Sequence, residues 1–238
     1  MSFVSLSSSS KLYDRKSAIA PHVEASPPSR SSLQQKSLVQ RAIKRLMDIS
    51  LSACALVVLS PVFLVIWAII RLESPGPGMF IQKRWGRNQR QIDVYKFRTM
   101  RTDEGDASGV AQTVANDPRL TRIGKLLRKS NLDELPQLLN VLLGSMSLVG
   151  PRCHPIGMLA GGVQYEELVP RYHDRHLVRP GLTGIAQVKG LRGPTVDAAR
   201  AVQRIEADLF YVQNYSVWLD IKLIVKTVSM ELRGGTGS

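Results

Sequence analysis

The sequence has little cysteine: Cys54 and Cys153 are the only two among 238 residues. They show neither the spacing of metal ligands nor that of a redox pair. Cys54 also lies within an apolar run, which argues against the disulfide framework of small secreted proteins. The cysteine content therefore indicates a chain that faces the cytoplasm.

Acidic residues are scarce relative to basic ones. Asp and Glu number 19 against 32 Lys and Arg, giving a formal net charge of +13 and a pI near 10.1. Such a surplus implies an anionic partner: nucleic acid, an acidic membrane surface or phosphorylated substrates. Apolar residues make up 44% of the chain, enough for a packed core.

Motifs that would explain the basic charge through nucleotide or nucleic-acid binding are missing. The chain has no P-loop G-x-x-x-x-G-K-[ST] and no glycine-rich dinucleotide fingerprint after a strand. It also has no Cys/His finger and no aromatic-rich ribonucleoprotein strand. His173 and His176 lack a third metal ligand at a recognisable spacing, so we expect surface or hydrogen-bonding roles for them. Lipid headgroups and pyrophosphates are the expected anionic partners, and nucleic acid is not.

Composition divides the chain into three parts. Residues 1–40 are rich in Ser and poor in apolar residues, which predicts a disordered tail without the apolar core of a signal peptide. Residues 41–71 contain a long apolar run, and residues 72–238 have the mixed composition of a compact cytoplasmic catalytic domain. No internal repeat is detectable.

The apolar run extends without charge from Ile49 to Ile70. A straight helix of this length is roughly 33 Å long, about the thickness of a hydrocarbon core, so we predict membrane insertion. Ser60-Pro61 lies in its middle, where proline removes a backbone hydrogen bond and the serine hydroxyl can satisfy a freed carbonyl. Basic residues flank the run on both sides: Arg41, Lys44 and Arg45 before it, and Arg71, Lys83, Arg84, Arg87 and Arg90 after it.

The positive-inside tendency draws both flanks toward the cytoplasm. A re-entrant helix that dips in, bends at Ser60-Pro61 and returns satisfies both flanks. A kinked single-pass anchor is the alternative that the residues leave open.

The remaining pattern predicts an α+β fold that is mostly helical with one small β-hairpin. Two β-type stretches, 79–85 and 92–97, are separated by Gly86-Arg87-Asn88, which predicts the hairpin. Residues 102–116 are polar and predict a mobile loop, and Asp117-Pro118 predicts a helix start.

Two further helices are expected. The first runs from Leu135 to Leu143 and ends at Gly144. The second carries apolar residues at helical spacing between Trp218 and Leu232, which suits an amphipathic helix at a membrane interface and equally well an ordinary core helix.

Adjacent carboxylates at Asp133 and Glu134 are the strongest candidates for chemistry. Their spacing alone favours first-turn residues that complement a helix dipole. In a basic setting they can instead divide two roles, one attacking phosphorus and the other holding Mg²⁺. Arg128 lies five residues earlier in the sequence, and Arg152 and Arg179 each lie beside Gly or Pro, where cations can bind phosphate oxygens.

Six sequence blocks, in order, resemble the bacterial sugar transferase family of monotopic polyprenyl-phosphate phosphoglycosyl transferases, and most closely its short members that initiate exopolysaccharide synthesis. The blocks are Lys44-Arg45-x-x-Asp48, Ser60-Pro61, Tyr95-Lys96-Phe97-Arg98-Thr99-Met100, Leu132-Asp133-Glu134-Leu135-Pro136-Gln137-Leu138, Ser147-Leu148-Val149-Gly150-Pro151-Arg152 and Val178-Arg179-Pro180-Gly181-Leu182-Thr183-Gly184.

The resemblance implies a re-entrant helix at Ser60-Pro61 and a catalytic domain on the cytoplasmic side of the bacterial inner membrane. It implies that Asp133 attacks the sugar-linked phosphate of a nucleoside-diphosphate sugar, expected to be a UDP-sugar, and that Glu134 holds Mg²⁺. Polyprenyl phosphate then accepts the sugar-1-phosphate from the covalent intermediate. The residues expected to contact substrate or phosphate are Arg128, Arg152, Arg179, Lys96 and Arg98.

Two positions depart from the family pattern. Cys153 replaces the second Pro of a Pro-Arg-Pro sequence, and Ile185 replaces a Trp. We expect both in regions of substrate contact. Two alternatives to the covalent route stay open: direct transfer in a ternary complex with Asp133 as a metal ligand, and a basic membrane-tethered binding protein without catalysis. The sequence specifies neither the sugar nor the oligomeric state.

Overall fold

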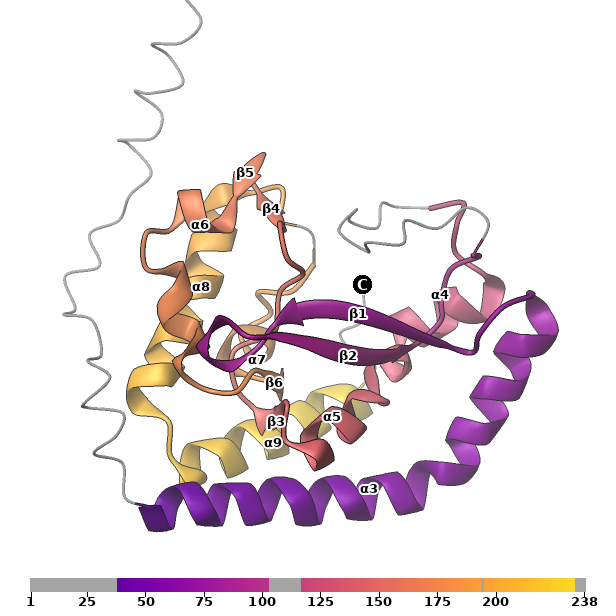
Figure 1. The fold of residues 1–238 in the computed structure, drawn as a ribbon, viewed down its shortest axis with the longest axis horizontal. Helices are drawn as coiled ribbons and strands as arrows, with labels where there is room; N and C mark the ends of the chain where they lie inside the picture. The colour runs from indigo at the N-terminus through magenta and orange to yellow at the C-terminus, as the bar shows by residue number, and fades with distance from the viewer. Residues whose placement is uncertain (1–37, 103–116, 194, 234–238) are drawn as a thin grey trace, which may run out of the picture.

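The computed structural model describes residues 38–102, 117–193 and 195–233. The predicted tail up to residue 37 and the predicted mobile loop from residue 103 onward lie outside this part of the chain. In the described part, helices surround three two-stranded sheets, which confirms the mostly helical α+β prediction. Figure 1 shows the longest helix, α3, forming the base of the molecule.

Helix α3 (Leu38–Glu73) begins and ends slightly outside the predicted 41–71 segment and continues through Pro61. Because Pro61 has no N–H, the Val57 carbonyl loses its helical donor. The Ser60 hydroxyl donates to that carbonyl over 2.8 Å, as predicted from the sequence. The predicted break is therefore a bend within one continuous helix, and Figure 1 shows the ribbon turning upward in its later part.

Most of the apolar surface of α3 faces away from the protein. Within the described residues, α3 is the one helix long and apolar enough to cross a membrane by length and composition, and only 11% of its most apolar window is buried. A core helix of a soluble protein would be mostly buried, so this surface requires an apolar environment outside the chain. The exceptions are Ile66 and Ile70, which pack against Phe97 and Leu127.

Polar contacts attach the first half of α3 to the rest of the protein. Lys44 Nζ donates to Asp220 Oδ2 over 2.6 Å, and the Asp220 side chain is fully buried. One turn later, Asp48 Oδ1 accepts hydrogen bonds from Ser147 Oγ at 3.1 Å and from Leu148 N at 3.0 Å. These contacts fix the direction in which α3 leaves the domain.

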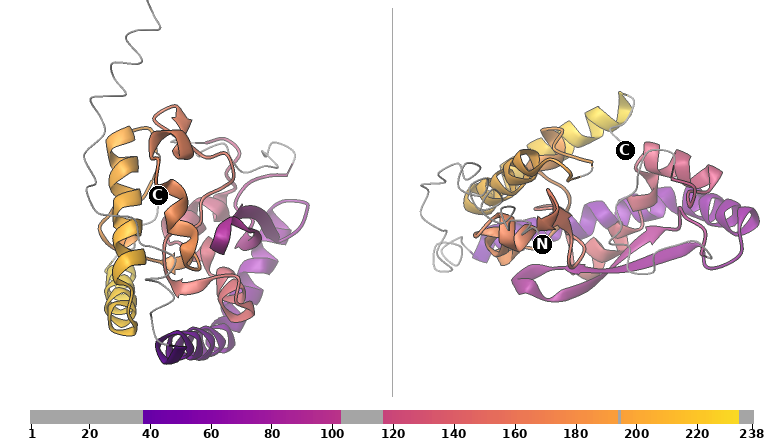
Figure 2. Two further views of the ribbon diagram at one scale, coloured as in Figure 1. Left: turned by 60° about the vertical axis from the view of Figure 1, so that its left-hand side comes forward. Right: turned by 90° about the horizontal axis from the view of Figure 1, so that it is seen from above.

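The predicted hairpin is present. Strand β1 (Met79–Trp85) pairs antiparallel with β2 (Gln91–Phe97), and the one-turn 3₁₀ helix η1 (Arg87–Gln89) joins them. Asn88 takes the left-handed conformation with φ of 55° that the tight connection needs. Seen from above in Figure 2, the hairpin lies on one side of α3 and the C-terminal helices on the other.

The next helix starts later than predicted. Helix α4 (Arg122–Lys129) is capped by Thr121, whose hydroxyl accepts from Gly124 N. Asp117 forms an ion pair with Arg119 instead of capping. The predicted start at Asp117-Pro118 was therefore wrong, because the Asp side chain pairs with a cation two residues ahead.

Helix α5 (Gln137–Leu143) ends at Gly144, as predicted, with φ of 90° at that glycine. Arg45 donates to the carbonyls of Val141 and Leu142 over 2.7 and 2.8 Å. A cation at these orphan carbonyls caps the helix and complements its dipole. One Arg of the long apolar helix α3 thus also ends helix α5.

The second half of the chain builds the main core. Parallel strands β3 (Ser147–Val149) and β6 (Gly181–Thr183) pack with α7 (Ile185–Val188), α8 (Ala198–Asn214) and α9 (Val217–Leu232). The sequence reading had predicted α9 but not α8 or the parallel pair. The smaller elements between β3 and β6 are β4 (Leu159–Ala160), β5 (Val163–Gln164), α6 (Tyr165–Leu168) and the 3₁₀ helix η3 (Tyr172–Leu177).

Replacing Lys44 with Met is expected to destabilise the protein, because it leaves the Asp220 carboxylate buried without its cation. We expect a loss of about 3–5 kcal/mol in the free energy of unfolding, measured by thermal or denaturant unfolding in detergent. The double variant Lys44→Met/Asp220→Leu should recover most of that loss. Additive losses in the double variant would show that the pair does not hold α3 in place.

Candidate active site

The two candidate carboxylates lie in η2 (Leu132–Glu134), a single 3₁₀ turn between α4 and α5. The chain enters this turn through Asn131, which has φ of 55° and whose side-chain amide donates to both carboxylate oxygens of Glu231 on α9. The left-handed residue ends α4 and redirects the chain, so η2 packs against strand β2. Asp133 and Glu134 therefore occupy a turn between helices and not the first turn of a long one.

Glu134 is neutralised by cations from two distant segments. Lys96 Nζ on β2 donates to Glu134 Oε1 over 2.7 Å. Arg152 binds both carboxylate oxygens, with Nη1 at 2.8 Å from Oε2 and Nη2 bonded to Oε1. Burial alone would raise the pKa of Glu134, but Arg152 and Lys96 hold it well below its ordinary value, and Glu134 in turn raises the pKa of Arg152.

Asp133 has a different environment. It is 7% exposed, and no hydrogen bond or ion pair joins its carboxylate to another described residue. Burial raises its pKa, with Glu134 adding to the rise, while Lys96, Arg128 and Arg152 act in the opposite direction. The surroundings thus raise the pKa of Asp133 and lower that of Glu134. Such a difference between two neighbouring carboxylates is typical of acids with separate roles.

The nearby cations are partly withdrawn from water. Burial lowers the pKa of Lys96 and of Arg128. The Arg128 guanidinium is oriented by a hydrogen bond from Nε to Thr99 Oγ1 at 2.9 Å. Cations held in low dielectric interact strongly with added negative charge, as a transferring phosphoryl group requires.

The backbone that carries Arg152 is itself held by two buried arginines. Arg175 donates to the Arg152 carbonyl and forms an ion pair with Asp208 at 2.6 Å, both side chains being 1% exposed. Arg84 donates to the Cys153 carbonyl over 2.8 Å. The sequence pattern predicts neither the role of Arg175 nor those of Asp208 and Arg84. Only the fold brings these groups together, since Asp208 lies on α8, a helix that was not predicted.

The predicted site residues do not all converge. Arg128, Lys96 and Arg152 surround the carboxylate pair. Arg98 does not: its guanidinium donates to the carbonyls of Ser74 at 2.8 Å, Ile70 at 3.3 Å and Pro75, and so caps the end of α3.

Arg179 also lies apart from the pair, lining a pocket near the N-terminal end of α3. Ser60 and Pro61 lie in the middle of α3 and serve the bend described above.

Both departures from the family pattern are core residues. Cys153 is 4% exposed and packs with Val94, Val141 and Met146. Ile185 is 7% exposed and belongs to the core around α8 and α9. Their side chains therefore fill the interior, and the expectation that their regions contact substrate stays a prediction.

The described residues contain no cluster of three or more His, Cys, Asp or Glu side chains able to hold a metal ion. Magnesium needs only one or two carboxylates when substrate phosphates supply further oxygens, so the Asp133–Glu134 pair fits it in number. The oxygens of Glu134 are bound by Arg152 and Lys96, whereas those of Asp133 have no such partner. Among the described residues, Glu134 Oε2 accepts a single hydrogen bond, from Arg152 Nη1, so a lone pair of this oxygen stays open to an ion while Lys96 and Arg152 remain bound.

The fold and the site define a protein that exposes one apolar helix and gathers buried cations around an acidic pair. The chain belongs to the bacterial sugar transferase family, whose model matches residues 39–234. This confirms the resemblance drawn from the six sequence blocks.

Three relatives illustrate the range of the family. The chain is 61% identical over 195 residues to "Exopolysaccharide production protein PSS" of Rhizobium leguminosarum bv. phaseoli, covering 82% of this chain and 98% of that protein. It is 46% identical over 190 residues to the "UDP-glucose:undecaprenyl-phosphate glucose-1-phosphate transferase" of Escherichia coli K12, covering 80% of this chain and 40% of that protein. It is 42% identical over 192 residues to the "UDP-N-acetylgalactosamine-undecaprenyl-phosphate N-acetylgalactosaminephosphotransferase" of Aeromonas hydrophila, covering 81% of this chain and 44% of that protein.

The burial of Cys153 can be tested by thiol labelling. In a Cys54→Ala background, Cys153 should resist maleimide in the folded protein and react once the protein is unfolded, because a buried thiol is inaccessible to reagent. Mass spectrometry of the labelled protein gives the result. Rapid labelling of Cys153 in folded protein would place the thiol on an open surface, where substrate contact is feasible.

Proposed function

We propose that this chain transfers a sugar-1-phosphate from a nucleoside-diphosphate sugar, most simply a UDP-sugar, to polyprenyl phosphate, as the first membrane step of exopolysaccharide or glycoconjugate synthesis. The observation that carries the proposal is Asp133, a buried carboxylate without a bonded partner, set among Lys96, Arg128 and Arg152. Relatives whose names state this reaction for glucose and for N-acetylgalactosamine support it. Because those two names differ in the sugar, the sugar for this chain stays open.

In the first step, an oxygen of the Asp133 carboxylate bonds to the phosphorus attached to the sugar. The bond from that phosphorus to the bridging oxygen breaks, and its electron pair leaves with the nucleoside monophosphate. A carboxylate nucleophile of this kind divides one difficult displacement into two easier ones. Arg128 is placed to bind equatorial oxygens as charge spreads over the phosphoryl group.

In the second step, a phosphate oxygen of the polyprenyl lipid bonds to the same phosphorus. The bond to the Asp133 oxygen breaks, which regenerates the carboxylate and releases the lipid diphosphate sugar. Lys96 and Arg152 keep Glu134 ionised throughout, since both bind it directly. Magnesium, when bound through Glu134 with the help of Asp133, would neutralise the pyrophosphate of the donor.

The placement of α3 fits a lipid acceptor. We propose that α3 re-enters the inner membrane: it dips in, bends near Ser60-Pro61 and returns to the cytoplasmic side. The bend in the helix, its exposed apolar surface and the basic residues at both ends support this arrangement. The catalytic domain then faces the cytoplasm, where nucleotide sugars are available, with anionic lipids at its basic surface.

Replacing Asp133 with Asn should lower kcat by roughly 10³-fold or more, because an amide cannot form the acyl phosphate. Wild-type protein incubated with a nucleotide sugar labelled in the sugar and without lipid should become labelled and release one equivalent of nucleoside monophosphate. The Asp133→Asn variant should do neither.

The alternatives give different results in this experiment. Intersecting initial-rate lines with no labelled protein would favour direct transfer with Asp133 as a metal ligand. Near-normal turnover of Asp133→Asn would remove Asp133 from the chemistry. Failure of the wild type to release monophosphate from any nucleotide sugar would favour a non-catalytic binding protein.

The raised pKa of Asp133 sets the acid limb of the pH–rate profile. The ionised carboxylate is the nucleophile, so kcat/KM should fall as pH drops through this pKa, at higher pH than for an ordinary Asp. Lys96→Gln removes a cation that lowers the pKa of Asp133, and the limb should therefore move to still higher pH.

Lys83→Gln is the matched control for Lys96→Gln. Lys83 lies on the adjacent strand and pairs with Asp93, but both side chains are largely exposed, at 65% and 49%. Its loss should leave the acid limb in place. If the acid limb of kcat/KM stays at the wild-type pH in Lys96→Gln, Lys96 does not help to keep Asp133 ionised.

A further inference from the structure

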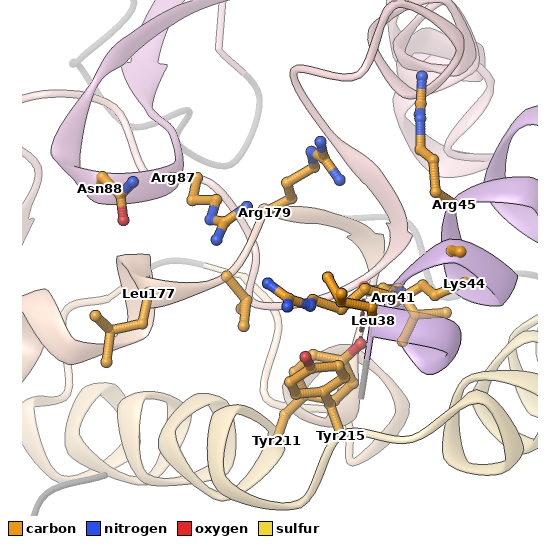
Figure 3. A pocket seen from close by; sticks show the side chains of 13 residues that line it. Leu38, Arg41, Lys44, Arg45, Arg87, Asn88, Leu177, Arg179, Tyr211 and Tyr215 are labelled. Carbon is orange, nitrogen blue, oxygen red and sulfur yellow. Dashed lines mark hydrogen bonds between the residues drawn. The ribbon is translucent and has the colours of Figure 1, made fainter. Parts of the chain in front are cut away.

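A second group of cations lies away from the acidic pair, around a pocket at the N-terminal end of α3. The pocket has a volume of about 670 Å³, within the range of about 300–1,000 Å³ typical of small-molecule sites. None of the described residues that line it makes a hydrogen bond or ion pair with Asp133 or Glu134. Figure 3 shows it from close by. Its positively charged lining residues are Arg41, Lys44, Arg45, Arg87 and Arg179.

Two of these five cations already have partners. Lys44 pairs with Asp220, and Arg45 caps α5 through two carbonyls. No hydrogen bond or ion pair within the described part of the chain uses the guanidinium groups of Arg41, Arg87 and Arg179. The Arg41 Nε is buried and unbonded. Three arginines thus face one pocket without a bonded anion.

The three arginines come from separate elements, so the fold brings them together. Arg41 lies in the first turns of α3, Arg87 in the hairpin connection, and Arg179 between η3 and β6. Figure 3 shows Arg41 and Arg87 reaching toward each other above the rings of Tyr211 and Tyr215. Burial lowers the pKa of Arg179, and Arg45 and Arg87 lower it further.

The nearest carboxylates lie outside the pocket and are hydrogen-bonded elsewhere, although the charge of Asp48 partly offsets the lowering of the pKa of Arg179. No acidic side chain lines the pocket among the described residues. Asp220 is bound by Lys44 and Tyr211, and Asp48 accepts from Ser147 and the Leu148 amide. Like charges that line one pocket repel one another, and an anion bound among them relieves that repulsion. The planar guanidinium fork suits the oxygens of a phosphate in particular.

The pocket also lies where a membrane surface is expected. It is next to the start of α3, whose apolar surface is exposed, and next to Tyr215, just before α9 begins with the exposed Trp218. A Trp at the start of an amphipathic helix is typical of headgroup depth. A ligand in the pocket would thus be at the level of lipid phosphates.

We propose that Arg41, Arg87 and Arg179 form a second anion site, distinct from the acidic pair, which binds a phosphate group at the membrane surface. That phosphate belongs to a lipid headgroup or to a soluble phosphate compound. The site anchors the N-terminal end of α3 through its ligand. It does not depend on the proposed transfer chemistry.

The test measures ligand binding to the full chain in detergent micelles. Phosphatidylglycerol is titrated and followed by native mass spectrometry, and inorganic phosphate and pyrophosphate are titrated in parallel and followed by the shift in melting temperature. Saturable binding of phosphatidylglycerol that Arg41→Gln/Arg87→Gln weakens supports a lipid source, and stabilisation by the soluble anions that the same variant weakens supports a soluble one. We expect binding to weaken by about tenfold for each guanidinium removed in Arg41→Gln and Arg87→Gln.

The control is Arg90→Gln/Arg122→Gln, which removes the same charge as Arg41→Gln/Arg87→Gln from two exposed positions outside the pocket. It should bind as the wild type does. The Asp133→Asn variant should also keep full binding, which separates this proposal from the transfer reaction.

The melting temperature of Arg41→Gln/Arg87→Gln without ligand shows whether this variant folds. The variant Arg41→Lys/Arg87→Lys keeps both positive charges and should bind more tightly than Arg41→Gln/Arg87→Gln. Equal binding by wild type and the Arg41→Gln/Arg87→Gln variant, equal weakening in the control, or no binding of any probe would overturn the proposal.

Discussion

The arrangement of the candidate active site depends on the ion pairs of Glu134 with Lys96 and Arg152. These three residues come from a 3₁₀ turn, a hairpin strand and the loop after β3, and their charges join the three segments around Asp133. Lys96 and Arg152 bind Glu134 directly. The carboxylate of the neighbouring Asp133 has no hydrogen bond or ion pair with another described residue. One carboxylate organises the site, which leaves the other available for chemistry.

Charged residues also attach helix α3 to the rest of the protein. Lys44, Arg45 and Asp48 lie within two turns of α3, yet they bind α9, the end of α5 and strand β3 respectively. Arg98 then caps the other end of α3. Both ends of an exposed apolar helix are therefore attached to the rest of the protein by polar contacts, and these contacts fix the direction of the helix relative to the acidic pair.

Much of this could be expected from the sequence. Periodicity and turn residues predicted the hairpin, α5 with its terminal Gly144, and α9. The Ser60 hydroxyl was expected to satisfy a carbonyl freed by Pro61, and it binds Val57. The start of α4 was misplaced because Asp117 pairs with Arg119, and α8 was missed because polar and charged residues interrupt its apolar pattern.

What the sequence alone determined are the properties that local patterns encode: the apolar run, the basic surplus, the adjacent acids and the family. Which cation serves which purpose was decided by the tertiary structure. Arg98, Arg152, Arg175 and Arg179 carry the same side chain, and nothing in their sequence neighbours tells their roles apart. In the fold they cap a helix, bind Glu134, hold a backbone carbonyl and line a separate pocket. The physical reason is that the role of an arginine depends on which carbonyls and carboxylates surround its guanidinium, and those groups come from segments far away in the chain.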